Sequence, residues 1–217
     1  MNIILFGPPG AGKGTQANNI VKAFKLLKVS TGDLLRNEVQ NNTNLGNIIK
    51  PLIEKGSFVS DEIINTIITK ILADKKHFNR LIFDGYPRNI NQAKNFIILL
   101  KKYNQKISCA LSLDVDKETL IKRIAGRQLC TKCKLVFNKY FSPATNENHK
   151  CDPRFLDKRT DDDDEKIIAG RYEDYLKKTL PILSFYKDLN LLHHINGKGD
   201  ISEIFEEIRV ILTSLDA

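Results

Sequence analysis

The sequence of 217 residues predicts an α/β fold in which helices cover both faces of a parallel β-sheet. Two observations lead to this prediction. Short and wholly apolar runs, of the length expected for buried strands, recur along the chain. Segments with apolar residues at helical spacing separate them, and strands that alternate with helices form parallel sheets. Residues 128 to about 160 differ from the rest in composition and indicate a small inserted subdomain.

The expected elements follow one another in a regular order. The runs that predict buried strands are Ile3–Phe6, Leu81–Phe83, Ile107–Leu113 and Leu191–Ile195. Helical patterns cover residues 16–24, about 31–40, 61–71, 96–100, 117–127, 165–186 and 201–215. Thr31 or Asp33 is expected to cap the second of these helices, because short polar side chains satisfy the free N–H groups of a first turn.

Composition excludes several classes of protein. Hydrophobic residues make up 41% and charged residues 28% of the chain, which is typical of a soluble globular protein. The sequence contains no apolar run of the roughly 20 residues that a membrane helix needs. No basic flank precedes Ile3, so we expect no secretory signal. Four cysteines are too few for a disulfide scaffold, and we expect a cytoplasmic protein.

Charge indicates anionic partners without deciding between them. Lys and Arg number 34 and Asp and Glu 26, so the net charge is +8. Nucleic acid and small phosphates both fit such a balance. The lysines are scattered along the chain, however, and most of them are expected to lie on a solvated surface.

The strongest motif is GPPGAGKGT, from Gly7 to Thr15. Its glycines allow backbone N–H groups to surround a polyphosphate, and the helix that follows directs its positive end at the same place. Lys13 can then reach the β- and γ-phosphates. The motif departs from the usual pattern because Gly14 follows the lysine and the hydroxyl of Thr15 comes one residue later. We therefore expect a phosphate-binding loop for a nucleoside triphosphate.

A second motif, Asp84-Gly85-Tyr86-Pro87-Arg88, follows the strand at residues 81–83. Ligands bind at the carboxyl ends of strands in open α/β sheets. Asp84 is expected to hold Mg²⁺ through water there, and Arg88 can clamp a phosphate. An ordinary turn with a surface ion pair is the alternative when this motif is considered alone.

Several motifs together resemble adenylate kinases in order and spacing. They are GPPGAGKGTQA, STGDLLR at 30–36, FDGYPRN at 83–89 with Gln92 beyond, the pair Arg123 and Arg127, and Arg159-Thr160-Asp161-Asp162 followed by Arg171. The resemblance covers nearly the whole chain and is closest to the bacterial long-lid type. It implies a P-loop NTPase-type core (1–29, 60–125 and 165–217), a helical AMP-binding region at 30–59 and an inserted lid at 126–164.

The resemblance also implies which residues bind the two nucleotides. On the ATP side they are Gly10, Ala11, Gly12, Lys13, Gly14, Thr15, Arg123, Arg127, Val136, Phe137 and Lys198. On the AMP side they are Thr31, Arg36, Ser57, Phe58, Val59, Gly85, Tyr86, Pro87, Arg88, Gln92, Arg159 and Arg171. The implied activity is reversible, Mg²⁺-dependent phosphoryl transfer from ATP to AMP, which gives two ADP, with the lid closing over the site.

The chemistry agrees with these assignments. In-line phosphoryl transfer between two anions depends on positioning and on neutralisation of charge. A positive cage of Lys13, Arg88, Arg123, Arg159 and Arg171 can supply both. The acceptor is already a phosphate oxyanion, so no general base is required. A closed lid would keep water from replacing the acceptor.

The lid cysteines leave two outcomes open. Cys130, Cys133 and Cys151 resemble the lid zinc site of many bacterial members, and thiolates suit tetrahedral zinc. The position three residues after Cys151, where the family has its fourth ligand, is Arg154, a cation. This favours a metal-free lid. If zinc is bound, His149, Asp152 or Asp157 must complete the site. Cys109 is expected to be an ordinary core residue.

Other functions remain to be distinguished. The nearest alternatives are a UMP/CMP kinase and a GTP:AMP phosphotransferase, and Gln92 favours adenine because its amide both donates and accepts hydrogen bonds. A nucleic-acid-binding module with a zinc ribbon would show salt-dependent binding. We expect a monomer with ATP, AMP and ADP as its partners, and neither nucleic acid nor membrane.

Overall fold

The structure is a computed structural model that describes residues 1–54, 59–158 and 165–216. Five parallel strands form its central sheet, in the order β2-β3-β1-β4-β8. In that order the strands are Leu27–Ser30, Leu81–Asp84, Asn2–Phe6, Cys109–Asp114 and Leu192–Asn196. Because all pairs are parallel, the carboxyl ends of the strands lie along one edge of the sheet, where ligands bind in such folds.

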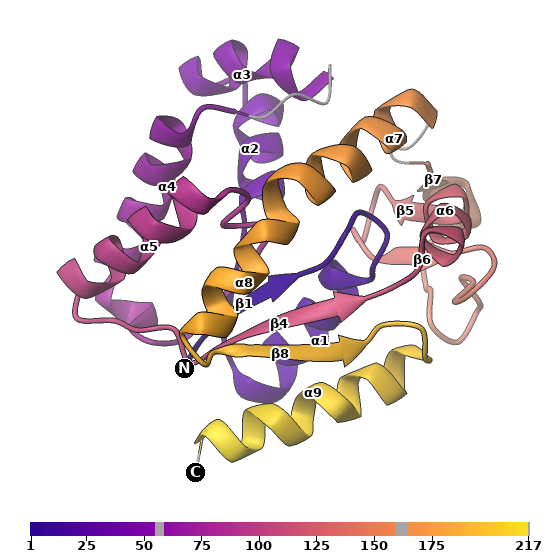
Figure 1. Cartoon of the computed structure of the whole chain (residues 1–217). Coiled ribbons are helices and arrows are strands. Elements are labelled where there is room, and N and C mark those ends of the chain that lie inside the picture. The colour runs from indigo at the N-terminus through magenta and orange to yellow at the C-terminus, as the bar shows by residue number, and fades with distance from the viewer. Residues whose placement is uncertain (55–58, 159–164, 217) are drawn as a thin grey trace.

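Helices cover both faces of the sheet (Figure 1). On one face lie α1 (Lys13–Phe24) and α9 (Ile201–Asp216), and on the other lie α4 (Asp61–Ala73), α5 (Ile90–Lys102) and α8 (Leu180–Asp188). Successive side chains of a strand point to opposite faces. In β1, accordingly, Ile3 and Leu5 join the core under α1 and α9, and Ile4 and Phe6 join the core under α4, α5 and α8. The predicted fold class is confirmed.

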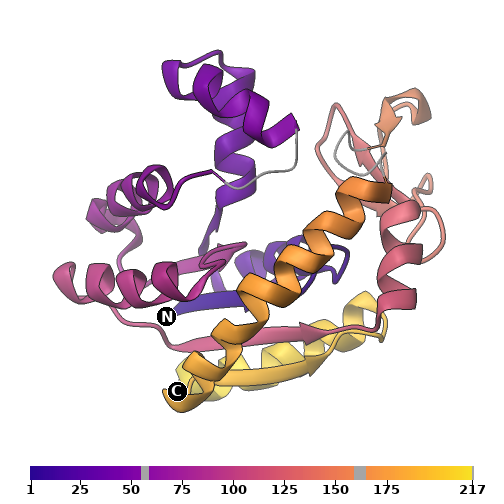
Figure 2. The same ribbon diagram turned by 45° about the horizontal axis from the view of Figure 1, so that its top comes forward.

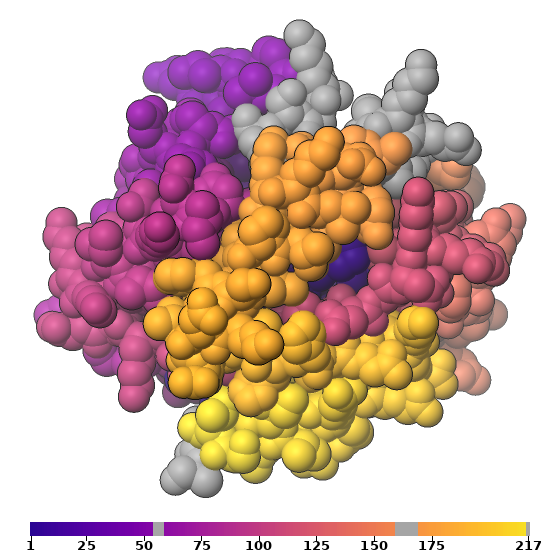
Figure 3. Space-filling view, viewed as in Figure 1, coloured from indigo at the N-terminus to yellow at the C-terminus, as the bar shows by residue number. Residues whose placement is uncertain are grey.

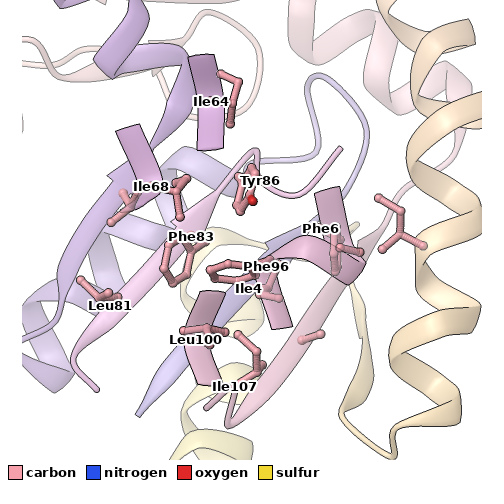
Figure 4. Packing of buried hydrophobic residues seen from close by; sticks show 14 of the residues in the cluster. Ile4, Phe6, Ile64, Ile68, Leu81, Phe83, Tyr86, Phe96, Leu100 and Ile107 are labelled. Carbon is pink, nitrogen blue, oxygen red and sulfur yellow. The ribbon is translucent and has the colours of Figure 1, made fainter. Parts of the chain in front are cut away.

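An aromatic group forms the centre of the larger core (Figure 4). The Phe96 ring of α5 meets the Phe83 ring edge-on with centroids 4.7 Å apart, and it meets the Tyr86 ring edge-on at 5.0 Å. Edge-to-face contacts of this kind stabilise beyond the area they bury. They hold the segment after β3 firmly against the sheet, and that segment carries Arg88.

Two further regions rise above the carboxyl edge of the sheet (Figure 2). One consists of α2 (Thr31–Gln40) and α3 (Asn44–Glu54). The other is a small antiparallel sheet in the order β6-β5-β7, formed by Val136–Asn138, Arg127–Cys130 and Leu156–Asp157, with a short 3₁₀ turn at Pro153–Phe155. α6 (Lys117–Ala125) leads into this sheet, and α7 (Glu165–Asp174) returns the chain to the core.

Element boundaries differ from the prediction in several places. The first helix begins at Lys13. The cap of α2 is Ser30 and not Thr31 or Asp33, because the Ser30 Oγ accepts a hydrogen bond from the Asp33 N–H at 3.3 Å. The expected helix 117–127 ends at Ala125, because the chain turns at Gly126, where a Cβ would lie 2.5 Å from the Tyr140 ring. The expected helix 165–186 contains a π-helical turn at Tyr175–Thr179.

Some elements were not predicted from the sequence at all. They are β2, a 3₁₀ turn at Lys75–His77 and the short strands β5, β6 and β7. The helix α3 lies in the region 30–59, which was expected to be helical, although its bounds were not predicted. β2 lies at the sheet edge and only Val29 in it is fully buried, so it lacks the apolar run that predicts a buried strand. Within the part of the chain that the structure describes, no helix has the length and apolarity to cross a membrane.

Candidate functional site

The loop between β1 and α1 has the form of a phosphate cradle. Gly10 has a φ of +84°, and a Cβ there would lie 2.8 Å from Ile124 of α6, so only glycine fits at this position. The loop is closed by a hydrogen bond of 3.2 Å from the Ala11 N–H to the Pro8 carbonyl. α1 begins directly after Gly12, which points its free N–H groups toward the loop.

Lys13 lies at the centre of this loop. Its Nζ donates to the carbonyls of Gly7 at 2.6 Å and Pro8 at 3.0 Å. Burial lowers the pKa of Lys13 to about 8. The Asp84 carboxylate opposes this shift, and several nearby guanidinium groups reinforce it. Those guanidinium groups belong to Arg88, Arg171 and Arg127. Three elements far apart in sequence thus bring their arginines near one buried ammonium group.

The surface of the molecule is hollowed on the side where α7 and α6 face each other (Figure 3). Figure 3 shows this hollow between α7 and the region of α6, with atoms of the N-terminal segment at its floor. The loop Gly7–Gly12 and the start of α1 belong to that segment. Lys13 also belongs to that segment, and a positive charge at a hollow is suited to binding a compact polyanion.

The segment after β3 holds Arg88 and Gln92 in fixed positions. The Arg88 Nε donates to the Gly85 carbonyl at 2.7 Å, and the Arg88 N–H donates to Gln92 Oε1 at 2.8 Å. Gln92 is 5% exposed, and its Nε2 donates to Asp61 Oδ1 at 2.6 Å. An amide has two N–H groups and two lone pairs, so Gln92 keeps one of each for a ligand.

The expected acceptor side begins at α2. Thr31 is buried and its Oγ1 donates to the Gly85 carbonyl at 2.9 Å, which ties α2 to the segment after β3. Arg36 forms an ion pair with Asp33 at 2.5 Å. Partial burial raises the pKa of Asp33, but the Arg36 guanidinium outweighs this effect and lowers it. Val59 is buried. Three residues expected in this site, Ser57, Phe58 and Arg159, lie outside the described residues.

The expected donor side includes α6 and the small antiparallel sheet. The Arg123 Nη1 donates to the Ala11 carbonyl at 3.4 Å, and its guanidinium lies 5.4 Å from the centre of the Phe141 ring. Arg127 begins β5. Lys198 follows β8 and forms an ion pair of 3.1 Å with Asp116. Phe141 was not predicted from the sequence, because nothing in the local pattern indicates its stacking on Arg123.

Val136 and Phe137 behave differently from each other. Val136 is half exposed, and the Phe137 side chain is buried against the His149 ring with the two centroids 5.0 Å apart. Any contact that Phe137 makes with a nucleotide must therefore use its backbone.

The lid brings four potential metal ligands together. The Sγ atoms of Cys130, Cys133 and Cys151 and one ring nitrogen of His149 all lie within 4.8 Å of one another. Burial raises the pKa of Cys130, yet hydrogen bonds from the Cys133 N–H and the His149 side chain outweigh it and lower the pKa to about 6. Burial and the two neighbouring thiols raise the pKa of Cys151 to about 11. Three sulfur atoms so close together favour a cation among them.

The donor set fits zinc. Four ligands at about 2.0–2.3 Å from one ion form the usual tetrahedral structural site, and three thiolates with one imidazole are a common set. His149 Nε2 is buried, and the described part of the chain gives it no hydrogen-bond partner. Arg154 is turned away, exposed and paired with Asp152 at 2.9 Å. The cation that argued against zinc in the sequence thus lies outside the cluster, and Asp152 is engaged elsewhere.

Comparison with known proteins assigns the family. A family model described as "Adenylate kinase" matches residues 5–191. An adenylate kinase of Pelagibacter ubique is 48% identical over 212 residues, which is 98% of this chain and 99% of that protein. Adenylate kinases of Petrotoga mobilis and Enterococcus faecalis are 36% and 37% identical, and each alignment covers at least 98% of both chains.

The chain belongs to the adenylate kinase family. It is accordingly a phosphotransferase that acts between ATP and AMP. No finding favours a UMP/CMP kinase or a GTP:AMP phosphotransferase. Members of the adenylate kinase family use Mg²⁺. Cys109 is fully buried in the core of this adenylate kinase, as predicted, and burial raises its pKa to about 12.

Proposed function

We propose that this adenylate kinase transfers the terminal phosphoryl group of ATP to AMP above Lys13, between two phosphate-binding regions that meet there. The observation that carries the proposal is the group of arginines from β5, α7 and the segment after β3 around one buried lysine. Transfer between two anions is slow mainly because their charges repel, so a preorganised positive cage supplies what the reaction needs.

Each side chain has a role in this proposal. Lys13 and the loop residues Gly10–Thr15 bind the β- and γ-phosphates of the donor, and Arg123 and Arg127 neutralise its charge. Arg88 forks onto the acceptor phosphate, a contact that a guanidinium makes with two parallel hydrogen bonds. Further acceptor contacts are assigned to Thr31, Arg36, Ser57, Phe58, Val59, Gly85, Tyr86, Pro87, Gln92, Arg159 and Arg171, and further donor contacts to Val136, Phe137 and Lys198.

Asp84 is the residue proposed to hold the magnesium ion through water. It ends β3, and its carboxylate is close enough to Lys13 to influence the pKa of that lysine. When bound, Mg²⁺ neutralises charge on the transferring phosphates. A carboxylate oxygen is the kind of ligand that this hard cation takes.

Closure of the lid is proposed to exclude water from the reaction. We assign residues 126–164 to the lid, 30–59 to the AMP-binding region, and 1–29, 60–125 and 165–217 to the core. Arg123 is in α6 and Arg127 is in β5, on either side of the proposed boundary between core and lid. Phosphates that attract these arginines would draw the lid down, so substrate binding itself would supply the energy for closure.

We further propose that the lid holds structural zinc through Cys130, Cys133, His149 and Cys151. The proximity of the four donor atoms supports it, and so does the buried Nε2 of His149, which has no hydrogen-bond partner among the described residues. Bound zinc would crosslink β5 to the segment before β7 and stabilise a subdomain too small for a large core.

The proposed setting is that of a cytoplasmic monomer that binds small nucleotides, and neither nucleic acid nor membrane. None of the four cysteines forms a disulfide bond in the structure, which agrees with a reducing compartment. The guanidinium groups of Arg88, Arg127 and Arg171 gather near Lys13, which supports a small anionic ligand.

A panel of acceptors tests the proposed function. Phosphoryl transfer from ATP to AMP, CMP, UMP and GMP would be measured in the same coupled assay. We expect AMP to be preferred by at least about 100-fold, because Gln92 offers both a donor and an acceptor to adenine. Arg171→Ala should lose nearly all turnover, and Arg209→Ala, on the exposed face of α9, should retain it. Equal rates with CMP or UMP would contradict the assignment.

A further inference from the structure

Lys28 lies beside the site and has no role in the chemistry described so far. It is in the middle of β2, and its side chain is 22% exposed. Its Nζ is 3.6 Å from Asp84 Oδ2 and 3.9 Å from Asp33 Oδ2, and it donates to Asn18 Oδ1 at 3.4 Å. The sequence did not single out this lysine, because one lysine in a short polar strand resembles any surface lysine.

The parallel pairing of β2 with β3 creates this contact. Lys28 pairs with Ile82, and Ser30 pairs with Asp84. The lysine side chain therefore reaches two residues along the sheet to arrive at the carboxylate. Gly14 leaves room for the meeting: a Cβ there would lie 3.8 Å from Lys28 Nζ and 3.9 Å from Asp84 Oδ2.

Asp84 consequently faces two lysines. Lys13 is on the side of the phosphate-binding loop, and Lys28 is on the side of β2. The Asp84 side chain is only 13% exposed, so water and salt screen its interactions weakly. Its negative charge is already compensated by these lysines in the protein without nucleotide.

We propose that Lys28 is a positioning residue that makes metal binding at Asp84 depend on bound nucleotide. The inference rests on the proposed role of Asp84 as the magnesium residue. A divalent cation near Asp84 is repelled by the Lys28 ammonium, which also competes for the carboxylate. Nucleotide phosphates bring enough negative charge to overcome this repulsion. Lys28 thus disfavours a metal ion without substrate and permits the metal–nucleotide complex.

Binding of Mn²⁺ to the nucleotide-free protein tests the proposal without an activity assay. Free Mn²⁺ would be followed by electron paramagnetic resonance in the intact chain. We expect Lys28→Gln to bind Mn²⁺ at least about fivefold more tightly than the wild type at low ionic strength. Lys28→Arg should stay within about twofold of the wild type, because it keeps the charge. Lys70→Gln, an exposed lysine of α4, is the control for net charge.

Several results would overturn the proposal. One is a Lys28→Gln protein that binds Mn²⁺ like the wild type, and another is a gain that persists in the double variant with Asp84→Asn. A third is a loss of more than about tenfold in metal-free ADP affinity, which would make Lys28 a phosphate ligand instead. If Lys28→Gln fails to fold, Lys28→Met carries the same expectation.

A separate arm distinguishes failure of this inference from failure of the Asp84 assignment. Asp84→Asn alone should weaken Mn²⁺ binding in the presence of a non-hydrolysable ATP analogue by at least about threefold. If it does not, the magnesium role of Asp84 is wrong. If it does, and the Lys28 variants have no effect without nucleotide, only the role of Lys28 is wrong.

Discussion

Arg88 connects the acceptor side of the site to the sheet. Its Nε donates to the Gly85 carbonyl at 2.7 Å, and its own carbonyl accepts from Thr179 Oγ1 at 3.0 Å. The backbone is thereby fixed between β3 and the π-helical turn before α8. A residue held at both its side chain and its backbone can present a guanidinium in one orientation, which is what a two-point contact with phosphate requires.

We predict that Arg88→Lys loses most of the activity although it keeps the charge. An ammonium group cannot form the parallel pair of hydrogen bonds, and arginine contacts in phosphoryl transfer are worth roughly 10³–10⁵ in rate. Turnover with saturating ATP and AMP is the measurement, with Arg209→Lys as the control on α9. A variant that kept more than about half the wild-type rate, with an unchanged melting temperature, would show that Arg88 is not the clamp.

The lowered pKa of Lys13 predicts how nucleotide affinity depends on pH. Burial lowers the pKa of Lys13 to about 8 in the free protein. The Asp84 carboxylate raises this pKa, and the guanidinium groups of Arg88, Arg171 and Arg127 lower it further. Phosphate favours the charged ammonium, so the bound state has the higher pKa. Affinity should therefore be greatest below pH 8 and fall as the pH rises above it, by up to about tenfold per pH unit.

Calorimetric titration with a non-hydrolysable ATP analogue from pH 7 to 9.5 measures this effect. Above pH 8, buffers of different ionisation enthalpy should report proton uptake on binding. Lys13→Arg is the matched variant, because a guanidinium stays charged over the whole range and should give a flat profile. A wild-type affinity that is constant between pH 7.5 and 9.5 would refute the shifted lysine.

At the scale of elements, the lid depends on crosslinks more than on a core. Its sheet consists of strands of four, three and two residues, and Tyr140 and Phe141 are exposed. Burial of so few apolar groups cannot hold about 35 residues firmly. The cluster of cysteines and His149 brings the end of β5 next to the segment before β7, where the Thr131 N–H also donates to the Phe155 carbonyl at 2.7 Å.

Metal removal and substitution of His149 should therefore affect stability more than chemistry. We expect about one zinc per purified chain, and a fall in melting temperature of about 5 °C or more after chelation or in His149→Asn, since 1 kcal/mol is worth roughly 2–4 °C in a chain of this size. Turnover should fall less, because none of the four cluster residues is among those assigned to the phosphates. Arg154→Ala should change neither quantity.

Elemental analysis and scanning calorimetry decide the question. A metal content far below one zinc per chain, with chelation leaving the melting curve unchanged, would contradict the zinc site. Hydrogen bonds and packing within residues 134–158 would then have to hold the lid.

The elements differ in how well the sequence predicts them. Buried strands β1, β3 and β4 have apolar runs because both of their faces are covered. β2 does not, because it is an edge strand, and Lys28 in it faces the site rather than the core. The π-helical turn at Tyr175–Thr179 leaves the apolar periodicity of α7 and α8 almost unchanged, so only the structure locates it.

At the scale of the whole molecule, the motifs predicted from the sequence meet because parallel strands end at one edge. Lys13 follows β1, Asp84 ends β3 and Arg88 comes shortly after it. β1 and β3 are adjacent strands, so their pairing brings these residues to one place. The sequence could not show that His149 completes the lid cluster or that Arg154 turns away from it. Those facts depend on how residues 134–155 fold back on β5, for which spacing along the chain gives no rule.

The two-sided site predicts the behaviour of a single molecule that spans it. A compound of two adenosines joined by five phosphates should occupy the donor and acceptor regions together across Lys13. ATP and AMP each lose translational freedom when they bind, whereas the joined compound loses it only once. It should therefore bind more tightly than either of them.

Competition experiments with this compound show whether the two phosphate-binding regions meet above Lys13. Inhibition would be measured against varied ATP at fixed AMP and against varied AMP at fixed ATP. Two phosphate-binding regions that meet above Lys13 predict competitive inhibition in both series, with an inhibition constant below both KM values. Inhibition that competes with ATP but not with AMP would contradict this arrangement, because the acceptor region would then lie elsewhere on the molecule.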